Sequence, residues 1–337
     1  MATMNIAIEI GTSHTSVYLE SAGVVLREPT AVAYVGDGDN KSVVAVGERA
    51  MSMMGKTPDK TTVVCPVVDG YIVDVDACKA MMSEYIKRIL PVSYIFFPKI
   101  KAILVTPTGL TVDERKVYED VVLQAGVAEV TLVDNVIATA LGFDLPIASP
   151  AGGFVVNIGG GITEIALISV CGIISGCSVN VGGSMMDRAL MDYLVGKYGL
   201  KVGGLTARRI REEIGTLYNN DVSYLEVKGI NINTLTPSTQ CVYAEDTCAA
   251  LLPYYARIAD AIQGVTNLCP PELSSSVQGS GVFVAGGCAK IPGVEKVLGE
   301  ILEIPVTVAE EPELVSVLGA GKLIGNKDLI KQIRSQQ

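Results

Sequence analysis

The stretch IEIGTSHTSVYLE, residues 8–20, decides the fold of this chain because its plan is repeated further along. An apolar strand ends in a polar side chain and Ile-Gly, turns through small residues, reaches a Thr and continues as a second strand. The stretch VNIGGGITEIALIS, residues 156–169, follows the same plan, and FVAGGCAKIPG, residues 283–293, joins a strand to a helix through two glycines. Hairpins duplicated roughly half a chain length apart predict two similar lobes that face a shared cleft.

Strand-like and helical runs alternate along the chain and predict an α/β fold. Hairpins are expected at residues 4–19 and 153–170, and helices at 77–90, 111–125, 135–143, 184–198, 206–217, 244–267, 293–302 and 313–324. Thr111 and Glu114 match a capping box. The tail GNKDLIKQIRSQQ is expected to be a loosely held helix end.

The repeat also suggests where the two lobes begin and end. We expect lobe I at residues 1–142, with a small insertion near 31–70 and with the C-terminal helix of residues 313–337 returning to it. Lobe II is expected at residues 143–312, with its own small insertion near 182–242.

Composition argues against several classes of function. The formal net charge of −10 disfavours a nucleic-acid partner, because phosphate backbones are bound by Lys and Arg. The eight cysteines form no C-x-x-C pair and His14 is the single histidine, so we expect reduced thiols in a cytoplasmic protein and no structural zinc. No basic region precedes the first apolar run, so no signal peptide is expected. The most apolar window, residues 154–175, contains Asn157, three glycines and Glu164, which indicates a buried hairpin and not a membrane span.

The glycine turns are candidate phosphate sites. Glycines in a tight turn let backbone N–H groups point at an anion, with no side chain in the way. A single glycine hairpin is most often only a turn. Two such hairpins, followed by the later Gly-Gly turn, favour a clamp for the phosphates of a nucleotide.

These motifs resemble the actin, Hsp70 and sugar-kinase ATPase superfamily, and within it the MreB family of bacterial actins. The resemblance runs nearly end to end, and it includes PVVDGYIVDVD at 66–76, LVTPTGLTVDERKVYEDVVLQAG at 104–126, VNVGGSMMDRAL at 179–190, LTARRIREEIGTLY at 205–218 and CPPEL at 269–273. It implies a two-lobed, actin-like fold of the duplicated ribonuclease H type, with a nucleotide cleft between the lobes. It also implies ATP with Mg²⁺ as the bound group, with GTP as an alternative.

The resemblance carries roles for individual residues. It implies that the β- and γ-phosphates are contacted by Gly11, Thr12 and Ser13 from one lobe and by Gly159, Gly160 and Gly161 from the other. Gly183, which follows the second turn in the sequence, is also expected among the nucleotide-binding residues. Arg211 and Glu213 would lie near the ribose and adenine, and Gly286 and Gly287 against the base and α-phosphate. The alternative for Arg211 and Glu213 is a solvated helix face with ion pairs.

Water activation is where the sequence departs most from the family. The family carries Glu-Glu-Pro, whose second Glu orients the attacking water, and here LVDNVIATALG at 132–142 aligns with that run. Asn135 therefore takes the place of that Glu, and Ile162 takes the place of the first Thr after the glycines. Because phosphoryl transfer depends on positioning, losing both groups predicts slow hydrolysis. Asp134 and Thr163 are the fallbacks, and Asp134-Asn135 fits a helix N-cap equally well.

The metal site departs as well. Glu9 and Asn157 occupy positions where most family members carry Asp, and those two aspartates hold the waters around Mg²⁺. Glu9 keeps the charge on a longer side chain, whereas Asn157 loses it, so we expect an altered Mg²⁺ dependence. Ser184 and Cys288 likewise replace the usual Asp and Gly.

The stretch PVSYIFFPKIK, residues 91–101, is a candidate membrane contact. It places four apolar residues between two prolines: Tyr94, Ile95, Phe96 and Phe97. We interpret them as a wedge that enters a bilayer, with Lys99 and Lys101 near anionic headgroups. MreB relatives are similar in carrying an apolar loop here. The alternative is a connector packed on the lobe, or the start of a strand at 100–105.

The predicted function is a filament-forming, ATP-dependent bacterial actin with weak ATPase activity. It would be cytoplasmic, peripheral at the inner face of the cell membrane, and active in cell shape. Its partners would be further copies of itself, the membrane surface, and membrane proteins of the cell-wall or shape machinery. One alternative is a chaperone-type ATPase, which would need a substrate-binding domain beyond Gln337. A small-molecule kinase would need an Asp base in a polar pocket, and a non-hydrolysing paralogue would regulate filaments.

Overall fold

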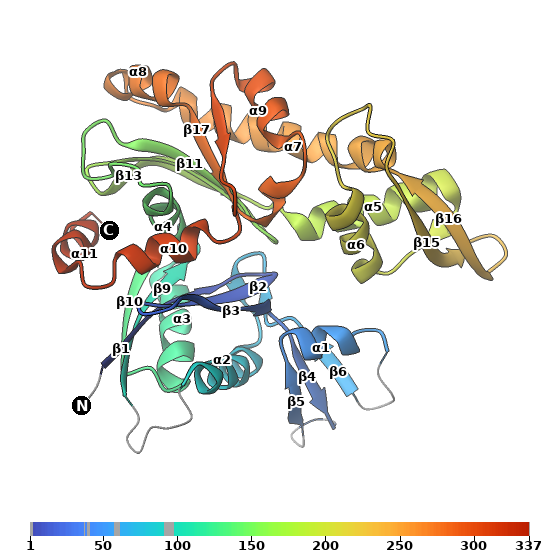
Figure 1. The fold of residues 1–337 in the computed structure, drawn as a ribbon, viewed down its shortest axis with the longest axis horizontal. Helices are drawn as coiled ribbons and strands as arrows, with labels where there is room; N and C mark the ends of the chain where they lie inside the picture. The colour runs from blue at the N-terminus through green and yellow to red at the C-terminus, as the bar shows by residue number, and fades with distance from the viewer. Residues whose placement is uncertain (1–2, 37, 39–40, 57–60, 91–97, 337) are drawn as a thin grey trace. The chain divides into compact units, whose positions relative to one another are not determined.

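The computed structural model describes residues 3–336 apart from 37, 39–40, 57–60 and 91–97, and leaves the side chains of 274–277 undescribed (Figure 1). The chain divides into two compact units. Unit 1 comprises Met1–Gly152, Ile168–Ile173 and Leu314–Gln337, and unit 2 comprises Gly153–Leu167 and Ile174–Glu313.

The main sheet of unit 1 has the strand order β10-β9-β1-β2-β3. Its strands are β1 (Thr3–Ile10), β2 (His14–Leu19), β3 (Gly23–Pro29), β9 (Lys99–Thr106) and β10 (Glu129–Asp134). β1 runs antiparallel to β2 and parallel to β9. Since strand side chains alternate, Ile6, Ile8 and Ile10 share one face, where they join a buried cluster with α2 (Val75–Ile89) and α3 (Val112–Gln124).

Unit 2 repeats this sheet. Its order is β13-β12-β11-β17-β18, built from β11 (Gly153–Ile158), β12 (Thr163–Ser169), β13 (Gly172–Val179), β17 (Val282–Ala285) and β18 (Val306–Val308). As in unit 1, three consecutive strands are followed by two strands parallel to the first. The buried cluster of this unit takes side chains from α5 (Gly183–Tyr198), α6 (Gly204–Ile214), α7 (Ala244–Asn267) and α9 (Val294–Leu302). The predicted duplication in an α/β fold is therefore confirmed.

Each unit also carries a small three-stranded sheet. In unit 1 the order is β5-β4-β6, with β4 (Val32–Val35), β5 (Ser42–Val46) and β6 (Thr61–Val64) accompanied by α1 (Glu48–Met53). In unit 2 the order is β14-β15-β16, with β14 (Leu200–Lys201), β15 (Tyr224–Asn231) and β16 (Pro237–Tyr243). A short ladder pairs β7 (Val67–Val68) with β8 (Tyr71–Ile72).

Several elements were not predicted, and one prediction was wrong. Among the missed elements are α1, β3, β13, β18 and α8 (Pro271–Ser280). The tail is not loosely held, because α11 (Lys327–Arg334) packs Ile333, which is 3% exposed, and Arg334 Nη2 donates to Thr131 Oγ1 at 3.1 Å. The capping box is confirmed, since Thr111 Oγ1 accepts from Glu114 N–H and Glu114 Oε2 accepts from Thr111 N–H.

Two glycines let helices approach closely in unit 1. α10 (Val315–Lys322) packs against α4 (Asn135–Gly142) and β1. A Cβ added to Gly319 would collide with the carbonyl oxygen of Ala138, and one added to Gly142 would collide with that of Val315. The two helix backbones are therefore in direct contact. Of the helices in the described ranges, none combines the length and apolar character that a bilayer crossing needs.

Candidate functional site

The two repeated turns have the same backbone geometry. Gly11 N–H donates to His14 O at 3.0 Å, and Gly159 N–H donates to Ile162 O at 2.9 Å. A Cβ added to either glycine would lie 2.9 Å from that same oxygen. Contacts this short are not seen for real Cβ atoms, so each turn requires glycine at its first position.

The first turn is held in place by Thr30, the residue that follows β3. Thr30 Oγ1 donates to Gly11 O at 2.7 Å, and Thr30 N–H donates to Ser13 O at 3.0 Å. Because a trans peptide points its N–H opposite its C=O, the N–H of Thr12 faces away from Thr30. Thr12 Oγ1 accepts from Gly70 N–H at 3.1 Å, which ties the turn to the β7–β8 ladder.

The second turn is held by the first residues of α5. Gly183 N–H donates to Gly159 O at 3.1 Å, and Ser184 N–H donates to Gly160 O at 2.7 Å. The N–H groups of Gly160 and Gly161 therefore face away from α5. Within the described part of the chain, neither of these two N–H groups has an acceptor. Successive N–H groups that converge in this way form a concavity for an anion.

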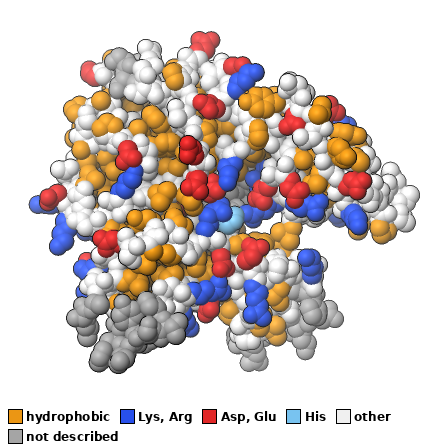
Figure 2. Space-filling view, in the orientation of Figure 1, with side chains coloured by type: hydrophobic (Ala, Val, Ile, Leu, Met, Phe, Trp, Pro, Cys, Tyr) orange, Lys and Arg blue, Asp and Glu red, His pale blue; other side chains and the backbone are white. Residues whose placement is uncertain are grey.

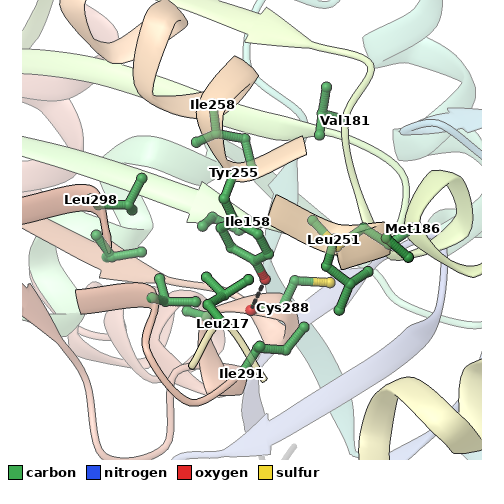
Figure 3. Packing of buried hydrophobic residues seen from close by; sticks show 14 of the residues in the cluster. Ile158, Val181, Met186, Leu217, Leu251, Tyr255, Ile258, Cys288, Ile291 and Leu298 are labelled. Atoms are coloured by element: carbon green, nitrogen blue, oxygen red, sulfur yellow. Dashed lines mark hydrogen bonds between the residues drawn. The ribbon is translucent and has the colours of Figure 1, made fainter. Parts of the chain in front are cut away.

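The Gly286-Gly287-Cys288 segment packs beneath the second turn. Gly286 has φ +90°, and a Cβ there would collide with Ile158 O and with Asn157 Oδ1. Cys288 Sγ donates to Gly159 O at 3.4 Å. Tyr255 Oη donates to Cys288 O at 2.6 Å inside the apolar cluster of unit 2 (Figure 3). Burial raises the pKa of Tyr255 well above its ordinary value, so its hydroxyl keeps the proton that it donates.

Arg211 and Glu213 differ sharply in environment. Arg211 is 7% exposed, and its guanidinium donates to Asp187 through Nε at 2.6 Å and Nη2 at 3.4 Å. The Glu213 carboxylate is half exposed and lies 3.6 Å from Arg209 Nε. Burial raises the pKa of Asp187, whereas Arg211 lowers it. Because the guanidinium is in direct contact, we treat this pair as ionised.

The residues aligned with the water-activating positions are engaged within their own units. Asp134 precedes α4 in the N-cap position but makes no capping bond, since its carboxylate forms an ion pair with Arg115. Asn135 is 9% exposed, and its Oδ1 accepts from Thr139 Oγ1 at 3.4 Å. Thr163 is fully buried and donates to Val181 O at 2.6 Å. Ile162 is partly buried and offers no polar group.

Glu9 and Asn157 occupy equivalent places, two residues before the first glycine of each turn. Glu9 is partly exposed near the end of β1, and Asn157 is 5% exposed near the end of β11. Carboxylate and amide oxygens are ligands that suit Mg²⁺, which usually keeps several of its waters. The donor chemistry of each side chain, taken by itself, therefore suits a hydrated magnesium ion.

Several supporting residues were missed by sequence reasoning, among them Thr30, Arg115 and Asp187. Each acts from a different element on a residue distant in sequence, so no local pattern marks it. The predicted membrane contacts Tyr94, Ile95, Phe96 and Phe97 lie outside the described residues. Lys99 is the first residue of β9 and Lys101 is its third.

Comparison with known proteins identifies the family of the chain and its fold. The family model described as MreB/Mbl protein matches residues 3–332. The chain is 35% identical to the cell shape-determining protein MreB of Escherichia coli K12 over 98% of this chain and 95% of that one. It is 34% identical to the cell shape-determining protein Mbl of Bacillus cereus, over 97% and 98%. The crystal structure of MreB5 of Spiroplasma citri bound to ADP superposes with a TM-score of 0.88 at 28% identity, covering 98% of each chain. The chain therefore belongs to the MreB/Mbl family, and its fold is actin-like.

Proposed function

We propose that this protein binds an adenine nucleotide through its two glycine turns and hydrolyses it slowly. The observation that carries the proposal is the direction of the N–H groups in each turn. The carbonyls of Gly11, Gly159 and Gly160 are hydrogen-bonded to the supporting elements. Thr12, Gly160 and Gly161 therefore present their N–H groups on the opposite side. Such donors are suited to the oxygens of a polyphosphate.

Two structures of one relative support adenine over guanine as the base. Crystal structures of Spiroplasma citri MreB5 are described as bound to ADP and to AMPPNP. The second of these matches this chain with a TM-score of 0.89 at 27% identity. ATP is therefore the proposed nucleotide, and GTP is its competitor in the tests below.

Slow hydrolysis is supported by the residues that align with the water-activating positions of the family. The Asn135 amide cannot accept a proton as a carboxylate would, and the carboxylate of Asp134 is held by Arg115. Thr163 uses its hydroxyl hydrogen on Val181 O. Glu9 and Asn157 would hold magnesium through waters, and the ion would neutralise charge on the phosphates.

Nucleotide titration by calorimetry tests the proposal. If backbone N–H groups bind the phosphates, ATP should bind at least about 100-fold more tightly than adenosine, because hydrogen bonds to charged groups contribute about 1.5–3 kcal/mol each. Equal affinity for ATP and adenosine, or the absence of binding with and without Mg²⁺, would contradict it. If GTP bound more tightly than ATP, the proposed base would change from adenine to guanine, and the proposed binding of phosphates by the glycine turns would stand.

Self-association in a cell-shape role is the second part of the proposal. It is supported by family membership and by relatives named as cell shape-determining proteins. We therefore expect partners among copies of this chain and among membrane proteins of the cell-wall or shape machinery. High-speed sedimentation with and without ATP tests it, since a polymer pellets and a chaperone-type monomer does not. A chain that pellets but never hydrolyses would be the filament-regulating paralogue.

A basic cluster in unit 1 supports a peripheral position on a membrane, which we also propose. Lys101 Nζ lies 2.6 Å and Lys99 Nζ 3.8 Å from Glu129 Oε2. Lys101 lowers the pKa of Glu129 most, and Lys99 and Lys327 add to the effect. Two lysine side chains therefore pair with one carboxylate, and the charge of Lys327 acts on the same group.

Helix α11 extends this cluster along its length. Lys327, Lys331 and Arg334 are spaced by four and three residues, which places them on one stripe of the helix, and all three are exposed. Asp328 lies off this stripe. Figure 2 shows basic side chains at the edge of the view where Figure 1 draws α11. In a chain of net charge −10, such a cluster is complementary to anionic lipid.

Vesicle co-sedimentation tests the membrane proposal. Each surface cation contributes about 1 kcal/mol on anionic membranes, so replacing Lys327, Lys331 and Arg334 with Gln should weaken binding to phosphatidylglycerol vesicles roughly 100-fold. The matched control replaces Lys201, Arg209 and Lys228 of unit 2 with Gln and should bind as wild type. Equal loss in both variants, or no binding by the wild type, would refute the surface. Replacing Phe96 and Phe97 with Ser tests the apolar wedge separately.

A further inference from the structure

The Arg211 side chain is enclosed by protein groups at the base of the second turn. Its Nε and Nη2 donate to the two oxygens of Asp187, and its Nη1 lies 3.9 Å from Cys288 Sγ. The Arg211 side chain is 8% exposed and that of Asp187 is 16% exposed. Three guanidinium nitrogens therefore each face a partner within unit 2.

The same guanidinium holds α5 at two points. Asp187 lies one helical turn after Gly183 on α5. A Cβ added to Gly183 would lie 3.2 Å from Arg211 Nη2 and 3.2 Å from Cys288 Sγ, so the arginine packs directly against the first turn of the helix. Gly183 and Ser184 are the residues whose N–H groups hold the carbonyls of the glycine turn.

Cys288 completes this arrangement from a third segment. The carbonyl of Gly159 accepts from Gly183 N–H on one side and from Cys288 Sγ on the other. Burial raises the pKa of the Cys288 thiol, so it keeps the proton that it donates. Tyr255 fixes the backbone of Cys288 in turn.

We propose that Arg211 is a positioning residue which, with Asp187 and Cys288, fixes the direction of the Gly159–Gly161 turn toward phosphate and makes no contact with the nucleoside. This inference rests on the proposed nucleotide binding and replaces the nucleoside role that the resemblance implies for Arg211. Without the ion pair between Arg211 and Asp187, α5 would be free to shift. The N–H groups of Gly160 and Gly161 would then no longer point toward the phosphate. Phosphate recognition should fail while nucleoside recognition persists.

The ratio of ATP affinity to adenosine affinity, measured by calorimetry, is the readout that separates these roles. Asp187→Asn and Arg211→Lys should each lower ATP affinity by roughly 10- to 100-fold, on the scale of one hydrogen bond to a charged group, with adenosine affinity changed less than about twofold. Arg209→Gln on the same helix is the matched control and should leave the ratio unchanged. The Arg209 side chain is half exposed and lies 3.6 Å from the carboxylate of Glu213.

Three outcomes would overturn the inference. A parallel loss of ATP and adenosine affinity would make Arg211 a nucleoside ligand. A lower melting temperature with an unchanged ratio would make the ion pair purely structural. If the buried pair does not tolerate substitution, Cys288→Ser and Cys288→Ala provide the test. Ser keeps a donor for Gly159 O and Ala does not, so only Cys288→Ala should lower the ratio of ATP affinity to adenosine affinity. An equal ratio in these two variants is the third outcome that would overturn the inference. If the wild-type protein does not bind ATP more tightly than adenosine, the proposed function itself is contradicted. The three outcomes above contradict only the positioning role of Arg211.

Discussion

Replacing Asn135 with Glu is expected to raise the rate of ATP hydrolysis by about 100-fold, the low end of what a positioned general base contributes. Residue 135 opens α4, and the preceding carboxylate of Asp134 is already committed to Arg115. A glutamate at 135 would therefore add an acceptor where the chain now has only an amide. Phosphate release at constant filament mass measures the effect.

Asn135→Gln is the matched control, because it lengthens the side chain without adding a charge, and it should leave the rate unchanged. Adding Ile162→Thr to Asn135→Glu should raise the rate further, since the family places a hydroxyl there. An unchanged rate in the double variant would show that slow hydrolysis has another origin. If the wild-type protein already hydrolyses ATP rapidly, Asn135 does not limit the rate of hydrolysis.

Among glycine-to-alanine substitutions in unit 1, Gly319→Ala is expected to lower the free energy of unfolding most. The new Cβ would collide with the carbonyl oxygen of Ala138, which is backbone and cannot rotate away. Overpacking costs about 1–3 kcal/mol when side chains can adjust, and here two helices must separate, so we expect at least about 3 kcal/mol. Urea unfolding followed by circular dichroism measures it.

Gly196→Ala is the control for helix propensity. Gly196 lies near the end of α5 and is exposed, and a Cβ added there would meet no neighbouring atom within 4 Å. The same substitution at this position should stabilise the protein by about 0.5–1 kcal/mol, because glycine is a poor helix former. Similar losses at both positions would mean that α10 does not approach α4 as closely as described.

Sequence reasoning succeeded where the signal is local and periodic. The duplicated hairpins, the long helix of residues 244–267 and the capping box at Thr111 depend on residues within a few positions of one another. The matching turns follow from the same pattern, since Gly11 and Gly159 occupy the same position in each hairpin. The duplicated hairpins and most of the helices were therefore predictable from patterning alone.

The supports of the site could not be read in this way. A helix pattern places Arg211 on α6 but does not reveal that Asp187 of α5 lies opposite, because that contact joins residues 24 positions apart. Thr30 follows β3, which was missed since its residues GVVLREP mix apolar and charged types without clear alternation. The tail was misjudged because KDLIKQIR appears polar, although Ile333 is buried.

The split composition of unit 1 has a consequence for how the protein is made. Its strands β1 to β3 leave the ribosome early, but α10, which packs on β1 and α4, is encoded after all of unit 2. Domains generally fold in order of synthesis, yet here residues 153–313 can complete their own sheet first. The nascent first unit would meanwhile expose the apolar surface that α10 later covers, so this interval is when a chaperone would be needed most.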